Sequence, residues 1–281
     1  MTHSFDSMII MEVGLSTAPF MWNYRLTYAL ETAHKLGYDG ISLRTGEPHA
    51  WPFSMSVSDK QLLKKTLDEL GLKPMLICPS WGDINLASPE PQAREFSLKV
   101  VRENIILAQN LGFEVVSLIA GRRYYFTTPP LEKSWKWASD SLEDLAYIAE
   151  KLNVMLALEP LPGTNLIEDP KQVVEMLKEV NSKYLMAQFD TVKANVIKSK
   201  MSLEEQIDIL KNYLVSVCLG DNDGTKLDHL PLRHGTVDFE LVIKKLKEIG
   251  YNKFLIVDLW YPQNPIEGAK ISIEYLKKLI K

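Results

Sequence analysis

The segment NLGFEVVSLI (110–119) ends one predicted helix and begins a predicted strand within a few residues. Apolar residues at helical spacing run up to the glycine, and a short apolar run follows it at once. A glycine or asparagine at this point supplies the left-handed residue that ends many helices. The same junction occurs at KLGYDGISL (35–43), ELGLKPMLIC (69–78), KLNVMLALE (151–159) and EIGYNKFLIV (248–257). This repeat predicts a chain of alternating helices and strands.

The predicted strands are short and almost entirely apolar, as in MLIC (75–78) and VMLAL (154–158). Such runs are typical of parallel strands covered by helices. The whole pattern predicts strands near residues 9–15, 40–44, 74–78, 114–120, 154–159, 184–190, 213–219 and 253–258. Eight units without a linker favour an α/β fold, a single (β/α)8 TIM barrel that spans residues 1–281 as one domain. The first strand-to-helix turn carries no glycine-rich phosphate motif, which disfavours an open doubly wound sheet.

Composition narrows the class of protein further. The 281 residues carry a net charge of −4, with Lys+Arg 32 against Asp+Glu 36, so no basic excess is available for a nucleic-acid backbone. The N-terminal residues lack the pattern of a signal peptide, and no apolar run approaches the roughly 20 residues of a transmembrane helix. Cys78 and Cys218 are too few for a disulfide framework. We expect a cytoplasmic protein that binds neither nucleic acid nor membrane.

The predicted strand-to-helix loops are long and rich in aromatic and basic residues. In (β/α)8 barrels these loops build the active-site face. Aromatic rings suit the apolar faces of sugars, and an arginine after the fourth strand suits a phosphate or carboxylate. Packing within the loops, or ordinary surface charge, is the alternative explanation for each residue. We expect substrate contacts from Trp51, Trp81, Arg122, Lys193, His229 and Trp260.

Four consecutive predicted strands each end with a potential metal ligand. These residues are Glu159, Asp190, Cys218 and Asp258. Because side chains alternate along a strand, the residue two positions earlier shares the face of each ligand, and the residue one position earlier faces the helices. The earlier residues on the ligand face are mostly small or polar, whereas those on the opposite face are all apolar. Oxygen and sulfur donors that converge in this way predict a divalent-metal site at the barrel mouth.

At this point the chain resembles the xylose isomerase-like TIM barrels, which include sugar and sugar phosphate isomerases and epimerases and share their fold with type IV AP endonucleases. The resemblance covers nearly the whole chain. It rests on GYDGISLR (37–44), LALEPLP (156–162), FDTVKAN (189–195), VCLGDNDG (217–224) and HLPLRHGTVDF (229–239). The endonuclease activity is disfavoured, because five histidines cannot supply a three-zinc cluster.

The resemblance implies a ligand set of Glu, Asp, His and Glu for Mn, Mg, Co or Zn. Glu159 and Asp190 match the first two positions, whereas Cys218 replaces the His and Asp258 replaces the second Glu. Lys193 stands where members carry a His that contacts substrate, and Arg44 stands where many carry an acidic residue. The two acidic residues at positions 159 and 258 are the implied proton shuttle. Related barrels also commonly form homodimers or homotetramers.

These departures leave two hypotheses open. In the first, the protein is a metal-dependent isomerase or epimerase of a sugar, sugar phosphate or inosose that moves a proton beside a carbonyl through an enediolate; a dehydratase is a close variant. Cys218 would then favour Zn, or would be an inert buried residue. In the second, the Lys193 ammonium replaces the metal's charge, and the barrel is metal-free or binds a sugar metabolite without catalysis. Lys193 as a Schiff-base nucleophile is a further alternative.

Overall fold

The computed structural model describes residues 11–124, 126–164, 166–261 and 263–280. Eight parallel strands form a closed barrel in sequence order, in which β1 pairs with β8. The strands are β1 (Val13–Ser16), β2 (Gly40–Thr45), β3 (Lys73–Pro79), β4 (Val115–Leu118), β5 (Met155–Leu158), β6 (Leu185–Asp190), β7 (Leu214–Leu219) and β8 (Leu255–Val257). The predicted (β/α)8 TIM barrel is therefore confirmed, and each strand lies within a few residues of its predicted place; positions 9 and 10 of the first predicted strand lie outside the described residues.

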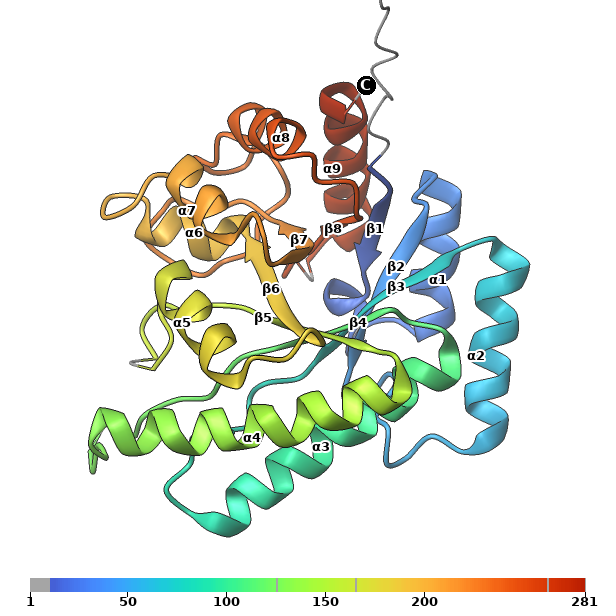
Figure 1. The fold of residues 1–281 in the computed structure, drawn as a ribbon. Coiled ribbons are helices and arrows are strands. Elements are labelled where there is room, and N and C mark those ends of the chain that lie inside the picture. The colour runs from blue at the N-terminus through green and yellow to red at the C-terminus, as the bar shows by residue number, and fades with distance from the viewer. Residues whose placement is uncertain (1–10, 125, 165, 262, 281) are drawn as a thin grey trace, which may run out of the picture.

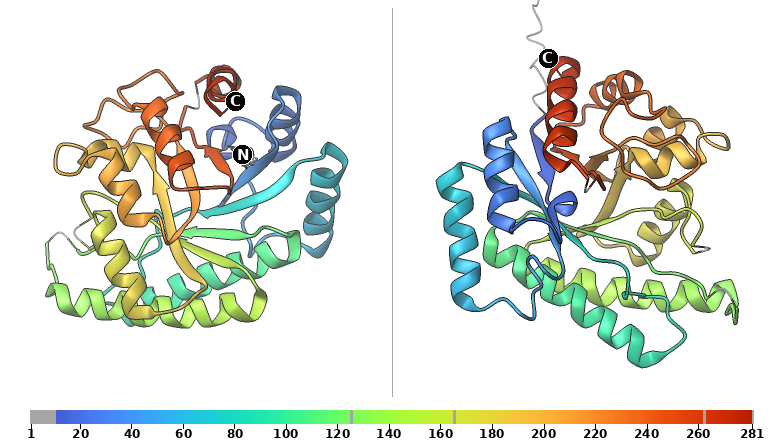
Figure 2. Two further views of the ribbon diagram at one scale, coloured as in Figure 1. Left: turned by 45° about the horizontal axis from the view of Figure 1, so that its top comes forward. Right: turned by 180° about the vertical axis from the view of Figure 1, so that it is seen from behind.

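The helices surround the barrel on its outside (Figures 1 and 2). They are α1 (Leu26–Leu36), α2 (Val57–Leu70), α3 (Pro91–Leu111), α4 (Leu131–Leu152), α5 (Pro170–Val180), α6 (Thr191–Ile197), α7 (Leu203–Leu210), α8 (Phe239–Glu248) and α9 (Pro265–Ile280), with a short 3-10 helix, η1 (Ala18–Phe20). One connection departs from the simple alternation, because both α6 and α7 lie between β6 and β7. Helix α6 begins directly after β6, so the end of that strand is also the start of a helix.

The helix-ending residues adopt the conformation that the repeated junction predicts. Gly37 follows α1 with a φ of 74°, Gly112 follows α3 with 84°, and Asn153 follows α4 with 53°. In each case the backbone N–H of this residue donates to a carbonyl of the last helical turn. The chain thus turns from helix to strand within a few residues. The short turns leave the other end of the barrel to the long loops.

Side-chain alternation along the strands matches the prediction. Leu158, Phe189 and Val217 face outward and join the large apolar layer between strands and helices. Ala157 and Cys218 belong instead to a smaller apolar group inside the barrel, together with Met75 and Ile256. Gly14 on β1 makes room for this group, because a Cβ there would lie 2.7 Å from Met75 Sδ and 2.8 Å from Ile256 Cδ1. The inner group fills the barrel below and beside the polar residues of its mouth, and Cys218 within it reaches the level of Asp190.

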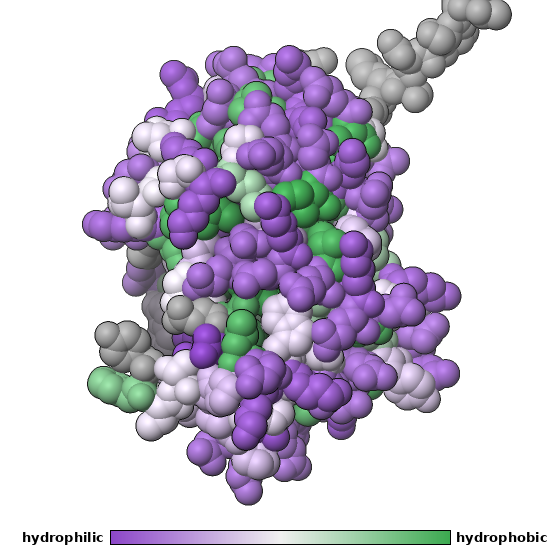
Figure 3. Space-filling view, turned by 60° about the vertical axis from the view of Figure 1, so that its left-hand side comes forward, coloured by the Kyte–Doolittle hydropathy of each residue, from purple (hydrophilic) through white to green (hydrophobic). Residues whose placement is uncertain are grey.

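The outer surface is hydrophilic over most of the face shown in Figure 3, and its apolar residues form small separate groups. Among the described helices, none combines the length and apolar character needed to cross a bilayer.

Candidate active site

A cavity of about 540 Å³ opens at the carboxyl ends of the strands. Most of the residues predicted to bind substrate or metal line it: Trp81, Arg122, Glu159, Asp190, Lys193, Cys218, His229, Asp258 and Trp260. Trp51 is not among the lining residues. Its ring packs on Phe53, with 5.2 Å between centroids, and against the edge of the main apolar core. The structure therefore brings the predicted residues together with the exception of Trp51.

Glu159 follows directly after β5 and is held by two donors. Lys193 Nζ lies 2.6 Å from Glu159 Oε2, and Gln188 Nε2 donates to the same oxygen at 2.5 Å. No described residue donates to Oε1, so this oxygen is the one available to a ligand in the cavity. Burial raises the pKa of Glu159 above its ordinary value, although Lys193 and Gln188 oppose the shift. A buried carboxylate with a raised pKa and one free oxygen is suited to accept a proton.

Lys193 is a buried cation between two carboxylates. Asp190 ends β6 and caps α6, since its Oδ1 accepts hydrogen bonds from the backbone N–H groups of Val192 and Lys193. This cap places the Lys193 side chain back over the strand end, with Nζ 3.4 Å from Asp190 Oδ2. Burial disfavours the charge, but the two carboxylates raise the pKa of Lys193 above its ordinary value. The ammonium is therefore a permanent positive charge in the barrel mouth.

A polar layer beneath Glu159 fixes its orientation. Gln188 donates to Glu159, and its own Oε1 accepts a hydrogen bond of 2.8 Å from Ser216 Oγ. Gln188 Nε2 also lies 3.5 Å from Ser117 Oγ. These residues occupy the inward face of β6, β7 and β4, respectively, between the apolar bottom of the barrel and the carboxylates. Because the Glu159 carboxylate only accepts, it requires the donor end of the Gln188 amide, and the Ser216 hydroxyl donates to the other end, so a directed chain of hydrogen bonds holds Glu159.

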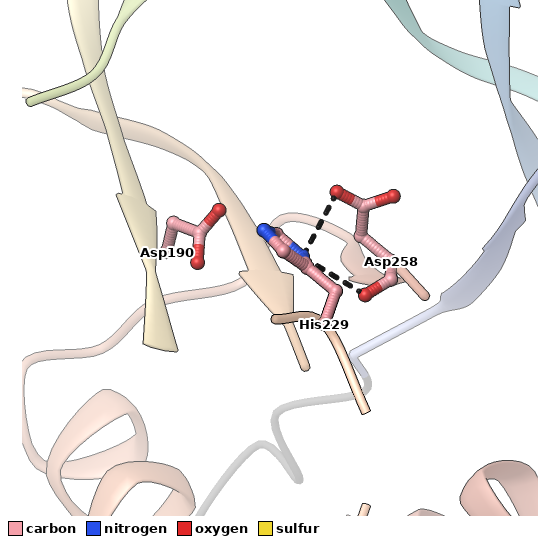
Figure 4. A group of neighbouring side chains, drawn as sticks. All are labelled: Asp190, His229 and Asp258. Carbon is pink, nitrogen blue, oxygen red and sulfur yellow. Dashed lines mark hydrogen bonds and ion pairs between the residues drawn. The ribbon is translucent and has the colours of Figure 1, made fainter. Parts of the chain in front are cut away.

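His229 lies between Asp190 and Asp258 (Figure 4). Its Nδ1 is 3.2 Å from the backbone oxygen of Asp258 and 3.4 Å from Oδ2 of the same residue. Its ring stacks on Trp260, with centroids 4.3 Å apart and planes at 17°. The loop is anchored on both sides of the histidine, since Trp260 N donates to His229 O and Leu230 pairs with Asp221. The imidazole is thus fixed in the cavity wall rather than exposed on a surface loop.

Asp190, His229 and Asp258 form a group that fits a divalent metal. One potential ligand atom from each residue lies within 4.8 Å of the other two. His229 Nε2 is buried and has no hydrogen-bond partner among the described residues. Two carboxylates and a neutral imidazole are ordinary ligands of Zn²⁺ and of related divalent ions. The sequence predicts substrate contact for His229; the structure adds it to the potential ligands.

Glu159 and Cys218 lie outside this group. Glu159 is paired with Lys193, and Cys218 is packed in the apolar group inside the barrel although it also borders the cavity. Burial, together with nearby Asp258 and Asp190, raises the pKa of the Cys218 thiol well above its ordinary value, so the sulfur stays protonated. A metal set that includes Glu159 and Cys218 stays a prediction.

Two tryptophans shape the cavity differently. Trp81, which follows β3, is buried, and its Nε1 has no acceptor among the described residues. Trp260, which follows β8, is 49% exposed, and its ring stacks on the buried His229 imidazole. Arg122, after β4, is exposed at the rim. The cavity therefore offers aromatic surface on two sides and a cation at its entrance.

Comparison with known proteins identifies the family. The pattern that describes the xylose isomerase-like TIM barrel matches residues 30–279. The chain belongs to this family. Its fold superposes on that of a D-tagatose 3-epimerase-like protein with a TM-score of 0.83, at 23% identity and over 96% of this chain and 98% of that one. D-psicose 3-epimerase from Clostridium cellulolyticum H10, solved with D-tagatose, gives a TM-score of 0.81 at 18% identity, over 96% and 100% of the two chains.

Relatives found by sequence comparison also have low identity to this chain. The chain is 24% identical over 269 residues to an uncharacterized protein of Methanocaldococcus jannaschii, which covers 95% of this chain and 90% of that one. It is also 24% identical over 263 residues to the fructoselysine 3-epimerase of Shigella flexneri, over 91% and 93% of the two chains. Several members of the family that it resembles are thus sugar epimerases.

Gln188 and Arg44 belong to the site, although the sequence analysis assigns neither of them a role in it. Gln188 lies two positions before Asp190 on β6, and the alternation of side chains places it on the cavity face, where it binds Glu159. Arg44 lies two positions after Ser42 on β2, and both residues line the cavity. The same parity argument that selected the carboxylates identifies these residues as part of the wall.

Proposed function

We propose that the protein is a sugar isomerase or epimerase that moves a proton at a carbon beside a carbonyl. The observation that carries the proposal is the Glu159 carboxylate: it is buried in the cavity wall, held through Oε2 by Lys193 and Gln188, and free at Oε1. The family resemblance supports the same chemistry, because several relatives are named as sugar 3-epimerases.

In the proposed reaction Glu159 Oε1 takes the proton from the carbon next to the carbonyl. The electron pair of the broken C–H bond forms a C=C bond, and the carbonyl oxygen becomes the oxyanion of an enediolate. The Lys193 ammonium lies beside Glu159 and favours negative charge in this region. It thereby lowers the cost of forming the enediolate.

Asp258 is the proposed second proton carrier. It follows β8, whereas Glu159 follows β5, so the two carboxyl groups approach the cavity from well-separated strands of the barrel. As a carboxylic acid, Asp258 would return a proton to the opposite face of the same carbon and give the epimer. Return of the first proton by Glu159 to the former carbonyl carbon would instead give the isomer, with transfer of the neighbouring hydroxyl proton to the former carbonyl oxygen. After epimerisation, exchange with water restores the proton on Asp258 and removes that on Glu159.

A divalent metal, when bound, would be held by Asp190, His229 and Asp258 and would supply positive charge to the substrate oxygens. In that case Asp190 contributes Oδ2, since its Oδ1 is occupied by the cap of α6. His229 is oriented for this role by its stack on Trp260.

One observation favours a second candidate, a barrel that binds a sugar metabolite without a metal. The Lys193 ammonium contacts Glu159 and Asp190, the two acidic positions that match the family's ligand set. A resident cation there meets the electrostatic need that a metal would otherwise meet. Occupancy by Zn, Mn or Co in the purified protein separates this candidate from the metal-dependent one.

The experiment that tests the proposal is proton exchange in deuterated water. The protein is incubated with a panel of neutral, phosphorylated and acidic ketoses, with and without added Mn²⁺ or Zn²⁺, and the substrates are followed by NMR and mass spectrometry. Gain of one deuteron beside the carbonyl, with a new epimer or isomer, supports the proposal. Absence of exchange with every ketose contradicts it and favours the binding protein.

A further inference from the structure

Arg44 places a positive charge in the cavity wall that no described carboxylate neutralises at close range. It lies near the end of β2, and its side chain lines the cavity. Its Nη1 donates to Cys78 Sγ at 3.0 Å, and no ion pair within 4.0 Å joins it to a carboxylate in the described chain. Asp258 and Glu159 act on it only through longer-range electrostatics. The guanidinium therefore retains donors for a ligand.

The partner of Arg44 does not balance its charge. Burial raises the pKa of the Cys78 thiol, although Arg44 opposes the shift, so the sulfur is a neutral hydrogen-bond acceptor. The nearby carboxylates are committed elsewhere: Glu159 and Asp190 contact Lys193, and Asp258 contacts His229. A largely buried guanidinium without a counter-ion costs folding free energy. An anionic ligand would recover that cost when it binds.

The carboxylates and the arginines of the cavity come from different strands, and Lys193 lies among the carboxylates. The carboxylates follow β5, β6 and β8, whereas the arginines lie on β2 and after β4. In the part that carries the arginines, Trp81 Nε1 and Arg123 Nε are both buried N–H donors without an acceptor among the described residues. Groups that can only donate are satisfied by an acceptor, which the oxygens of an anionic ligand can supply. This part of the wall, from β2 to the loop after β4, thus presents cations and unused donors, and Glu159 follows the next strand, β5.

We propose that Arg44 forms the centre of an oxyanion subsite, so that the substrate is a ketose bearing a carboxylate or phosphate group. The inference rests on the proposed function and adds the substrate class to it. The planar guanidinium can bind either group through two parallel hydrogen bonds, and Arg122 at the rim adds long-range attraction. A substrate whose anionic group contacts Arg44 extends across the cavity toward Glu159. A neutral ketose lacks this anchor and binds more weakly.

Binding measurements test the subsite without any need for turnover. The probes are inorganic phosphate and acetate, with tryptophan fluorescence and calorimetry as readouts. In Arg44→Gln we expect the affinity for the oxyanion to fall about ten- to a hundredfold, as for loss of a charged hydrogen-bond partner. Arg44→Lys keeps the charge and should retain part of the affinity. Arg102→Gln, on the exposed surface of α3, is the matched control and should bind as the wild type does.

The outcomes separate the ligand sources and the two proposals. Phosphate binding alone assigns a sugar phosphate, and acetate binding alone assigns a sugar acid. Anion binding that depends on Arg44, without deuterium exchange in any ketose, leaves the subsite intact and contradicts the enzyme. Failure of the wild type to bind either probe, or equal binding by wild type and Arg44→Gln, overturns the subsite. Thermal unfolding checks the fold: the wild type should gain melting temperature with the oxyanion, and folded Arg44→Gln should not.

Discussion

Lys193 Nζ lies 2.6 Å from Glu159 Oε2 in the mouth of the barrel, and both side chains are almost fully buried. The two residues are distant in sequence, and the fold brings them together because β5 and β6 are neighbours and α6 begins directly at the end of β6. The ammonium orients the carboxylate, occupies one of its two oxygens and supplies positive charge where an enediolate would form. Most of the chemistry proposed for the site depends on this contact.

Removal of the Lys193 charge should destabilise the fold. In Lys193→Met two buried carboxylates lose their cation, and we expect the free energy of unfolding to fall by about 3–5 kcal/mol. Urea denaturation at neutral pH measures the change. Lys35→Met is the control, because the Lys35–Glu31 pair is exposed and should contribute at most about 0.5 kcal/mol. Equal losses in the two variants would show that the buried pair has no special stabilising role.

The pH dependence of proton exchange should report Glu159. Its pKa is raised above the ordinary 4.5, and only the deprotonated form can accept a proton, so the exchange rate should fall as the pH falls through a value above 4.5. Lys193 opposes this rise. In Lys193→Gln the acid inflection should therefore move to higher pH. Lys198→Gln, whose Nζ contacts Thr236 Oγ1 instead, should leave the inflection in place. An inflection that moves down in Lys193→Gln would contradict the assignment.

Metal binding should depend on His229 and not on Cys218. We expect His229→Ala and Asp258→Asn to weaken Zn²⁺ or Mn²⁺ binding at least about tenfold, since each removes a ligand of the Asp190–His229–Asp258 group. Cys218→Ala should bind the metal unchanged, because the sulfur lies outside this group and packs among apolar residues. Calorimetry with the purified variants measures both effects. Loss of metal in Cys218→Ala with retention in His229→Ala would restore the ligand set predicted from the sequence.

An added methyl group at Gly14 should force the Met75 and Ile256 side chains to shift inside the barrel. Gly14→Ala places a Cβ against Met75 Sδ and Ile256 Cδ1, and we expect a loss of about 1–3 kcal/mol in unfolding free energy. Gly82→Ala is the matched control, since nothing lies within 4 Å of the Cβ that it adds. A stability of Gly14→Ala equal to that of the control would mean that the inner group can rearrange at no cost.

The repeated helix–glycine–strand junctions were sufficient to predict the barrel, because a left-handed residue followed by an apolar run is typical of a helix that ends and leads directly into a buried strand. Alternation along the strands likewise placed Asp190 and Asp258 on the cavity wall. The same reasoning did not find the contact between Asp190 and His229. His229 lies in the long loop between β7 and α8, and its position depends on a bridge between Asp221 and Leu230 and on the stack with Trp260. Such loop geometry has no period in the sequence.

Strand alternation and residue type also could not predict which of two similarly placed residues takes part in the site. Cys218 and Asp190 occupy paired positions on adjacent strands, yet the sulfur joins the apolar group and the carboxylate caps α6. Trp51 shares its residue type and loop context with Trp81, but packs on Phe53 outside the cavity lining. In each case the difference comes from the direction of one side chain in a three-dimensional environment.

The most direct test of the account compares wild type with Glu159→Gln for deuterium incorporation into a ketose. The amide keeps the shape of the side chain and a polar contact with Lys193, but it cannot accept the proton. We predict that the wild type exchanges the hydrogen beside the carbonyl and that Glu159→Gln, measured below its lowered melting temperature, does so about 10²–10⁴ times more slowly while it still binds the oxyanion. Exchange at the wild-type rate in Glu159→Gln would contradict the central role of Glu159.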